Sequence, residues 1–162
     1  MSDLSMLING LKVTAEKGAT FERRNPLDGS VATRAPAASA ADAVMAVEAA
    51  AEAFKTWGET GPGTRRALLL KAADALESKT PRFIEAMAAE TGATAMWAGF
   101  NCMLAAGMIR EAAALTTQVA GEVIPSDVPG SLAMGVRQPA GVVLGIAPWN
   151  APIILGVRAI AT

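Results

Sequence analysis

The chain has 162 residues, 52% of them hydrophobic, which is enough for one domain, or a large part of one, with a buried core. Its 14 basic and 15 acidic residues give a net charge of −1, so it lacks the excess of cations needed to bind a nucleic-acid backbone. With no histidine and the single cysteine Cys102, it excludes histidine-based catalysis, histidine-ligated metal sites and an intrachain disulfide.

Two pairs of short strands are expected near the N-terminus. Met6–Ile8 and Leu11–Val13 flank an Asn-Gly dipeptide, which favours a type I′ hairpin. Residues 21–25 and 31–35 flank a second cluster of turn-forming residues. The first residues carry no charged and apolar signal segment, so we expect a cytoplasmic protein.

Apolar residues at helical spacing predict four helices in the alanine-rich middle of the chain. Their expected ranges are 40–57, 64–78, 81–91 and 94–120. Ser39 and Asp42 form a capping-box pattern at the first helix, and Thr80 is expected to cap the third. Gly99 and Gly107 inside the fourth helix indicate close approach by a neighbour.

Beyond Gly121 the periodicity changes from helical to strand-like. Alternating apolar residues predict a strand over 132–136, and the continuous apolar run 141–146 is typical of a strand buried on both faces of a parallel sheet. An apolar helix follows from Ile153 and continues to Thr162, from which we expect the chain to belong to a longer protein.

The uncharged run 138–157 is long enough on paper to cross a bilayer. Its three prolines and Asn150 argue against a membrane span, because a buried strand, turn and helix explain the same run without leaving backbone groups unpaired in lipid. We therefore expect no membrane association.

The turn after the predicted strand places Asn150 at the start of the last helix, where open α/β sheets bind ligands. Its side-chain amide, next to the helix-start amides, can stabilise a developing oxyanion. Capping of the helix by Asn150 is the plainer alternative.

Four segments, in the same order along the chain, resemble the family of NAD(P)-dependent aldehyde dehydrogenases. They are Asn25-Pro26-Leu27-Asp28-Gly29, residues 66–76, Glu90-Thr91-Gly92, and residues 139–152 with the signature Pro148-Trp149-Asn150. The resemblance implies an α/β fold with a Rossmann-like parallel sheet and alanine-rich helices. It assigns 1–120 to the N-terminal part of the cofactor-binding domain, 121–138 to a β oligomerisation arm, and 139–162 to the first strand-turn-helix of the nucleotide-binding sheet.

The resemblance also implies roles around this turn. Asn150 would hold the aldehyde oxygen and then the oxyanion through its side-chain amide. The nicotinamide-ribose end of NAD or NADP would be lined by Ile146, Ala147, Pro148 and Trp149. The thiolate nucleophile, the glutamate base and the groups that bind the adenine ribose would all lie beyond Thr162.

Bulky side chains on the fourth predicted helix form a stripe that the resemblance places along the substrate tunnel. They are Trp97, Phe100, Asn101, Leu104 and Met108. Ordinary core packing explains the same stripe. Cys102, on this helix, has no nearby cation to lower its pKa, and we expect a buried structural thiol.

Ile154 and Arg158 follow Asn150 by four and eight residues, which puts them broadly on its side of the last helix. The Arg158 guanidinium can bind a phenolic oxygen or a carboxylate, while Trp97 and Phe100 stack on a ring. A salt bridge is the alternative role for Arg158.

These features favour an enzyme that oxidises a hydroxybenzaldehyde-type aldehyde to the acid with NAD or NADP, through a thioester. The expected assembly is a homodimer or a homotetramer, without nucleic acid, membrane or metal. Two alternatives remain: a semialdehyde dehydrogenase, and a non-catalytic helical module in which Asn150 only caps its helix.

Overall fold

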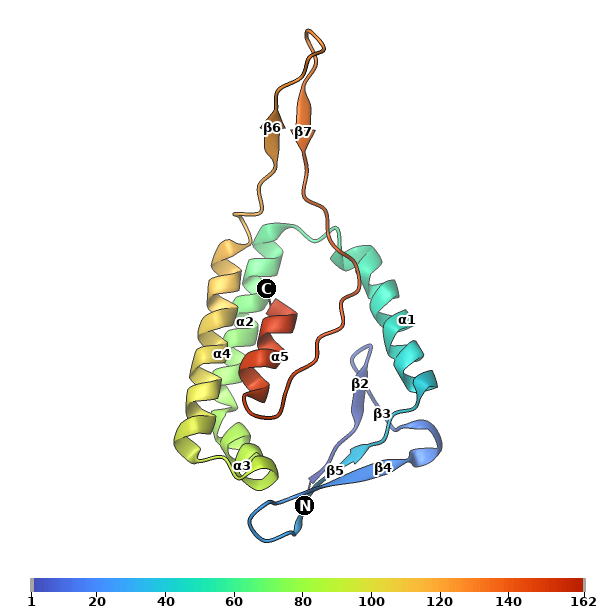
Figure 1. The fold of residues 1–162 in the computed structure, drawn as a ribbon, viewed down its shortest axis with the longest axis vertical. Helices are drawn as coiled ribbons and strands as arrows, with labels where there is room; N and C mark the ends of the chain where they lie inside the picture. The colour runs from blue at the N-terminus through green and yellow to red at the C-terminus, as the bar shows by residue number, and fades with distance from the viewer. Residues whose placement is uncertain (1, 162) are drawn as a thin grey trace.

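The computed structural model describes residues 2–161. Three helices, α2, α4 and α5, pack side by side with α3 at one end, while α1 stands apart and a long hairpin projects from the top (Figure 1). The elements in chain order are β1 (Ser2–Asp3), β2 (Met6–Ile8), β3 (Leu11–Val13), the short 3₁₀ helix η1 (Glu16–Gly18), β4 (Thr20–Arg24), β5 (Val31–Pro36), α1 (Ala40–Trp57), α2 (Pro62–Ser78), α3 (Thr80–Thr91), α4 (Ala95–Leu115), β6 (Glu122–Ile124), β7 (Ala133–Gly135) and α5 (Pro152–Ala161).

Both predicted strand pairs near the N-terminus are confirmed. β2 and β3 pair antiparallel around Asn9 and Gly10, whose φ angles of 51° and 75° are those of the expected type I′ turn. β4 pairs antiparallel with β5, and β1 adds to the other edge of β5 in parallel. The β1 pairing was not predicted, because two residues carry no periodicity.

The capping box predicted at the start of α1 is present. The Ser39 hydroxyl accepts from the Asp42 backbone N–H at 3.2 Å, and the Asp42 carboxylate accepts from the Ser39 N–H at 2.8 Å. The same carboxylate accepts a third bond from the Glu16 N–H at 3.0 Å. These N–H groups, Ser39 first and then Glu16, lower the pKa of Asp42. One side chain therefore joins the start of α1 to η1.

Alanine forms most of the helical core. The buried alanines on the helices are Ala73 of α2 and Ala98, Ala105, Ala106, Ala112 and Ala113 of α4. Ala73 and Ala106 pack with Ile109 in one cluster, against which α5 places Val157. Side chains this small let α2 and α5 approach α4 closely.

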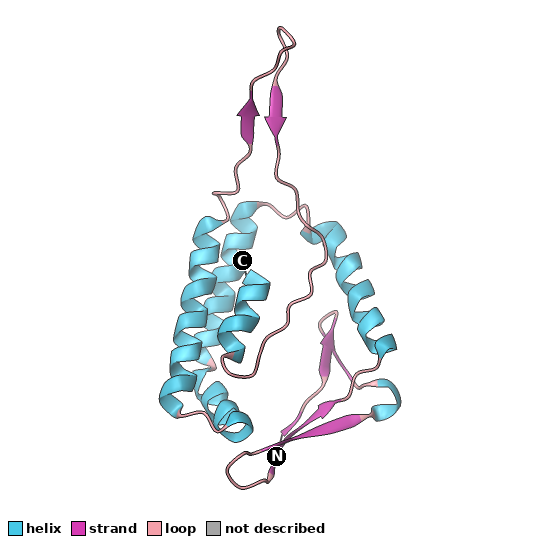
Figure 2. Cartoon of the chain, in the orientation of Figure 1, coloured by secondary structure: helices cyan, strands magenta, loops and turns pink. Residues whose placement is uncertain are grey.

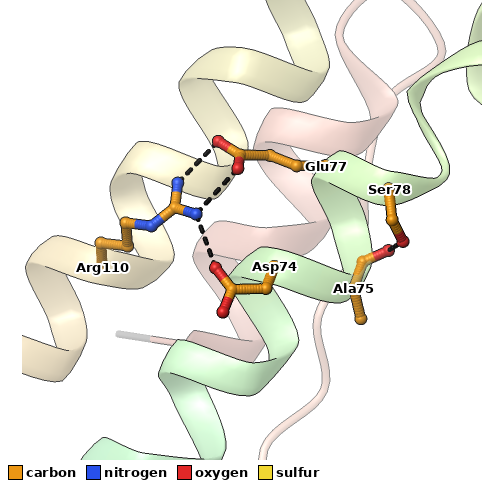
Figure 3. A network of polar contacts seen from close by, with 5 residues as sticks. All are labelled: Asp74, Ala75, Glu77, Ser78 and Arg110. Atoms are coloured by element: carbon orange, nitrogen blue, oxygen red, sulfur yellow. Dashed lines mark hydrogen bonds and ion pairs between the residues drawn. The ribbon is translucent and has the colours of Figure 1, made fainter.

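An arginine on α4 holds α2 from the outside of the bundle (Figure 3). The Arg110 guanidinium donates to both carboxylate oxygens of Glu77, at 2.6 and 2.8 Å, and to Asp74 at 2.8 Å. The fork of Arg110 matches the carboxylate geometry and lowers the pKa of Glu77. Arg110 is thus bonded to Glu77, 33 residues earlier in the sequence, and to Asp74, 36 residues earlier.

Three details of the helices differ from the prediction. α4 ends at Leu115, five residues early, because the β-branched Thr116, Thr117 and Val119 disfavour its continuation. α3 begins at Thr80 itself, so Lys79 and not Thr80 is its N-cap. Gly107 has no neighbour within 4 Å of an added Cβ among the described residues, so the expected close approach is not made within this part of the protein.

The strand predicted over 132–136 is confirmed in its central residues, as β7 of the projecting hairpin. β7 pairs antiparallel with β6, and a Cβ on Gly121 would overlap the carbonyl oxygen of Gly135 at the base of the hairpin. Most large apolar side chains of the hairpin are exposed: Val123, Ile124, Val128, Leu132, Met134 and Val136. The hairpin therefore has no core of its own.

The strand predicted over 141–146 is absent from the described structure. The segment is drawn as a loop that runs from the hairpin to α5 (Figure 2), and Val143, Leu144 and Ile146 are exposed. A strand needs a hydrogen-bonded neighbour, and residues 2–161 provide none for it. The only parallel pair in this part of the chain is β1 with β5, so the expected Rossmann-like sheet is not formed here. None of the helices described is long and apolar enough to cross a membrane.

Candidate functional site

The extended segment before α5 lies along that helix in the opposite direction. A Cβ on Gly145 would overlap the side chain of Ala159, and one on Gly156 would lie 3.9 Å from the Ala147 side chain. Small residues on both partners thus bring the segment against α5, which fixes where the connecting turn lies. This contact was not predicted. The small residues on both sides of the turn, such as Gly145 and Gly156, are the sequence feature from which it could have been predicted.

The turn carries an asparagine that is not used as a helix cap. α5 begins at Pro152, and the carbonyl of Ala151 accepts its first helical bond, from Leu155 at 3.1 Å. Ala151 therefore occupies the capping position. Within the described residues, the Asn150 side-chain amide is exposed and makes no hydrogen bond, unlike the capping side chains of Ser39 and Thr94. An unused amide donor at a helix N-terminus remains available to a ligand.

An aromatic pair from α4 lies beside this turn. The Trp97 and Phe100 rings stack with centroids 5.6 Å apart and an interplanar angle of 22°. The Trp97 indole N–H donates to the backbone carbonyl of Asn150 at 3.0 Å, across 53 residues of sequence. Both rings remain 41% exposed, and Leu104, further along the same helix, is 39% exposed. The structure therefore brings together two features, the stripe and the turn, that the sequence presented separately.

Asn101 lies on the same helix but points into the core. It is fully buried, and its Nδ2 donates to the Trp97 carbonyl at 3.0 Å. Its Oδ1 has no partner within the described part of the chain. The sequence placed Asn101 on the stripe expected along the substrate tunnel, with core packing as the alternative. Its spacing of four residues from Trp97 was the available signal for this internal bond.

The two predicted residues on α5 have different surroundings. Ile154 is 7% exposed on a helix that packs against α4, so in this arrangement it offers little surface to a substrate, contrary to the prediction. Arg158 is exposed in the last turn of α5, two turns after Asn150. The packing of α5 on α4 thus buries Ile154 and leaves Arg158 exposed.

Cys102 is the buried thiol that the sequence predicted. It is 1% exposed, and this burial raises the pKa of the thiol, an effect that a hydrogen bond with Thr80 opposes only in part. A thiol that is both inaccessible and protonated is a poor nucleophile. Among residues 2–161 there is also no cluster of three acidic or cysteine side chains that could hold a metal ion.

The four residues predicted to meet a cofactor lie on the exposed segment before Asn150. Ile146 is 82% exposed and Trp149 is 69% exposed, with Ala147 and Pro148 between them. Within the described chain, the backbone groups of 146–149 make no hydrogen bonds with other backbone groups. Apolar surface and free backbone groups next to a polar amide are compatible with the nicotinamide-ribose end of a dinucleotide.

An exposed amide donor at a helix N-terminus, after an extended segment, is an arrangement in which α/β proteins bind ligands. Comparison with known proteins identifies the family. Residues 13–162 match the model of the aldehyde dehydrogenase family, and the chain belongs to that family.

Similar proteins include dehydrogenases of aromatic aldehydes. A vanillin dehydrogenase of Pseudomonas fluorescens is 60% identical over 161 residues, which cover 99% of this chain and 33% of that protein. The crystal structure of a salicylaldehyde dehydrogenase from Pseudomonas putida G7, complexed with salicylaldehyde, has a TM-score of 0.95 and 49% identity, over 99% of this chain and 33% of that one. An NAD-dependent benzaldehyde dehydrogenase from Corynebacterium glutamicum gives a TM-score of 0.90 and 34% identity, over 96% and 34%.

The chain therefore spans about one third of the length of the relatives it matches. Over that third it has the α/β aldehyde dehydrogenase fold, as the sequence predicted. The absent strand over 141–146 agrees with this partial coverage, because its hydrogen-bonding neighbours are not among the residues present.

Proposed function

We propose that the protein carrying this chain oxidises an aromatic aldehyde of the hydroxybenzaldehyde type to the corresponding carboxylic acid, with NAD or NADP as the electron acceptor. The observation that carries the proposal is the stacked Trp97–Phe100 pair next to the Asn150 turn. It puts aromatic surface beside an amide donor, which are the two contacts that a benzaldehyde needs. The names of the relatives, vanillin and salicylaldehyde dehydrogenase, support the same substrate class.

The chemical contribution of this chain is stabilisation of negative charge on the substrate oxygen. The Asn150 amide N–H donates to the aldehyde oxygen and donates more strongly as that oxygen becomes an oxyanion. Residues 146–149 would hold the nicotinamide end of the cofactor, which would supply the hydride acceptor when bound. Cys102 is buried, and the family resemblance implies that the nucleophile and the base come from other residues, beyond Thr162.

Arg158 is proposed to select the ring substituent. Its exposed guanidinium lies two helical turns from Asn150 and can bind a phenolic oxygen. The same group favours a second candidate function, oxidation of a semialdehyde whose distal carboxylate pairs with Arg158. The aromatic pair of Trp97 and Phe100 distinguishes the two functions, because only oxidation of an aromatic aldehyde uses it.

The test is a substrate comparison with the intact protein. Oxidation of vanillin, salicylaldehyde, benzaldehyde and succinic semialdehyde is measured with NAD and with NADP, in the wild type and in Arg158→Ala. We expect the hydroxylated benzaldehydes to give the highest kcat/KM, and Arg158→Ala to reduce that preference over benzaldehyde. An unchanged substrate profile in Arg158→Ala removes Arg158 from the proposal. Absence of oxidation of every aldehyde favours the non-catalytic helical module.

The β6–β7 hairpin is proposed to be the arm that joins subunits into a homodimer or a homotetramer. Val123 and Met134 are directly opposite each other in its register, and both are exposed, so that one face of the hairpin is apolar and uncovered. Light scattering of Met134→Asp is expected to show smaller particles than the wild type. An unchanged mass would make the arm a surface hairpin within one subunit.

A cytoplasmic location remains part of the proposal.

A further inference from the structure

Besides the packing of residues 145–147 against α5, the backbone around Asn150 is held by one side chain from another part of the chain. Between residue 138 and the start of α5, the described structure contains no backbone–backbone hydrogen bond that fixes the path of the segment. The Asn150 carbonyl instead accepts the indole N–H of Trp97 at 3.0 Å. No other side-chain hydrogen bond joins α4 to this segment within residues 2–161.

The donor is itself rigidly placed. The Trp97 backbone N–H donates to the Thr94 hydroxyl at 3.2 Å, which is the N-cap bond of α4. One turn later, the buried Asn101 amide donates to the Trp97 carbonyl at 3.0 Å. The ring stacks on Phe100. Backbone and ring of Trp97 are thus both fixed, so its N–H occupies a defined position relative to the helix.

We propose that Trp97 is a positioning residue for Asn150, and this inference rests on the proposed function. The carbonyl and the side-chain amide belong to one residue, so holding the carbonyl leaves only the side-chain torsions of Asn150 to be ordered when it meets the substrate oxygen. A donor that is already oriented is worth more in the transition state than one ordered during the reaction. The indole N–H is committed to this bond, and Trp97 therefore contacts a substrate ring through its ring and not through its N–H.

This role predicts an effect on turnover that does not depend on the aromatic ring of the substrate. Trp97→Phe keeps a ring on α4 and removes the N–H. We expect kcat to fall by about five- to tenfold, the equivalent of one net hydrogen bond, with KM nearly unchanged. The same fall is expected with an aliphatic aldehyde such as propanal, because the bond acts on the asparagine and not on the ring. A contact made only with the substrate ring would change KM for the aromatic aldehyde alone.

The decisive measurement is a double-mutant cycle in the intact protein with Trp97→Phe, Asn150→Ala and the combined variant. If Trp97 acts through Asn150, Trp97→Phe causes no further loss of kcat when Asn150 is already alanine. Trp57→Phe, which changes an indole at the end of α1, is the matched control and leaves kcat and KM unchanged. Thermal unfolding confirms that each variant is folded, which we expect because the Trp97 ring is 41% exposed.

Three results would overturn the inference: an unchanged kcat in Trp97→Phe, a rise in KM for the aromatic aldehyde alone, or equal losses with and without Asn150. In each of these the wild type still oxidises aldehydes, and the proposed function stands. If the wild type oxidises no aldehyde, the proposed function fails, and the inference fails with it.

Discussion

The helical bundle and the extended segment from residue 119 to 150 contrast in how far their apolar side chains are covered. In α2 and α4, alanines such as Ala73, Ala105 and Ala113 are completely buried, and Arg110 is paired with two carboxylates. From residue 119 to 150, large apolar side chains such as Leu132, Leu144 and Ile146 are each more than 70% exposed. The inner faces of α2 and α4 are covered by each other, whereas the segment 119–150 has no such cover among the described residues.

Because of this difference, we expect stability and activity to depend on different residues. A packed helix face has little freedom to meet a ligand, whereas an uncovered apolar segment with free backbone groups needs a neighbouring subunit, a sheet or a ligand to cover it. Asn150 lies in the second region and is held by Trp97 of the first. Changes at the buried positions of the bundle should therefore affect folding, whereas changes at Asn150, or at Trp97 that bonds to it, should affect activity.

The largest expected effect is on activity, with folding unchanged. Asn150→Ala removes the amide donor and is expected to lower kcat by about 10²- to 10³-fold, the usual loss for one oxyanion-stabilising group. Steady-state kinetics of the intact protein with vanillin measures the loss. Asn9→Gly, at a turn position with positive φ, is the control and should leave kcat unchanged. A fall in thermal stability of Asn150→Ala comparable to that of a core variant would contradict the separation.

The next largest effect tests the packed region. Ala105→Leu adds three carbon atoms where Ala105 is 0% exposed, and overpacking should lower the free energy of unfolding by about 1–3 kcal/mol. Urea unfolding measures the change. Ala114→Leu, on the same helix at an exposed position, is the matched control and should change stability little. Equal losses in the two variants would show that Ala114 is also covered in the intact protein.

A smaller effect, of opposite sign, is expected at a helical glycine. Gly107→Ala should stabilise α4 by about 0.5–1 kcal/mol, because an added Cβ meets no atom within 4 Å among the described residues and the helix loses a flexible position. Gly92→Ala is the contrasting variant: with a φ of +68° and the Pro26 ring 3.1 Å from an added Cβ, it should destabilise. Destabilisation by Gly107→Ala would mean that another part of the protein lies on that face.

The smallest effect concerns the ion pairs on the bundle surface. Arg110 lowers the pKa of Glu77, so its contribution is present above the ordinary carboxylate pKa and is lost as the pH falls through the lowered pKa. Arg110→Ala should thus unfold at a lower urea concentration than the wild type at neutral pH, and the difference should disappear in acid. Lys55→Ala, which breaks an exposed pair within α1, is the control and should show less dependence on pH. A difference that persists after protonation would assign the role of Arg110 to packing of its carbon chain.

Much of the local structure could be predicted from residue patterns. Asn9-Gly10 defined its hairpin, Ser39 and Asp42 defined the start of α1, and the apolar spacing gave α1 its bounds at Ala40 and Trp57. Each of these signals acts within a few residues, so no distant partner was needed. The end of α4 was missed because β-branched residues after Leu115 outweighed the apolar pattern.

The sequence by itself determined the helices, the turns and the presence of an asparagine after an apolar run, because propensity, capping and periodicity are local properties. The family was indicated separately, by four segments that resemble its motifs in the same order. Only the tertiary structure decided the environment of each candidate residue. It buried Ile154, left Trp149 exposed, directed Asn101 inward and joined Trp97 to the Asn150 carbonyl. Such contacts depend on how helices and segments far apart in sequence pack, and the apolar run 141–146 shows the same dependence: it forms a strand only where a neighbouring strand is present to accept its hydrogen bonds.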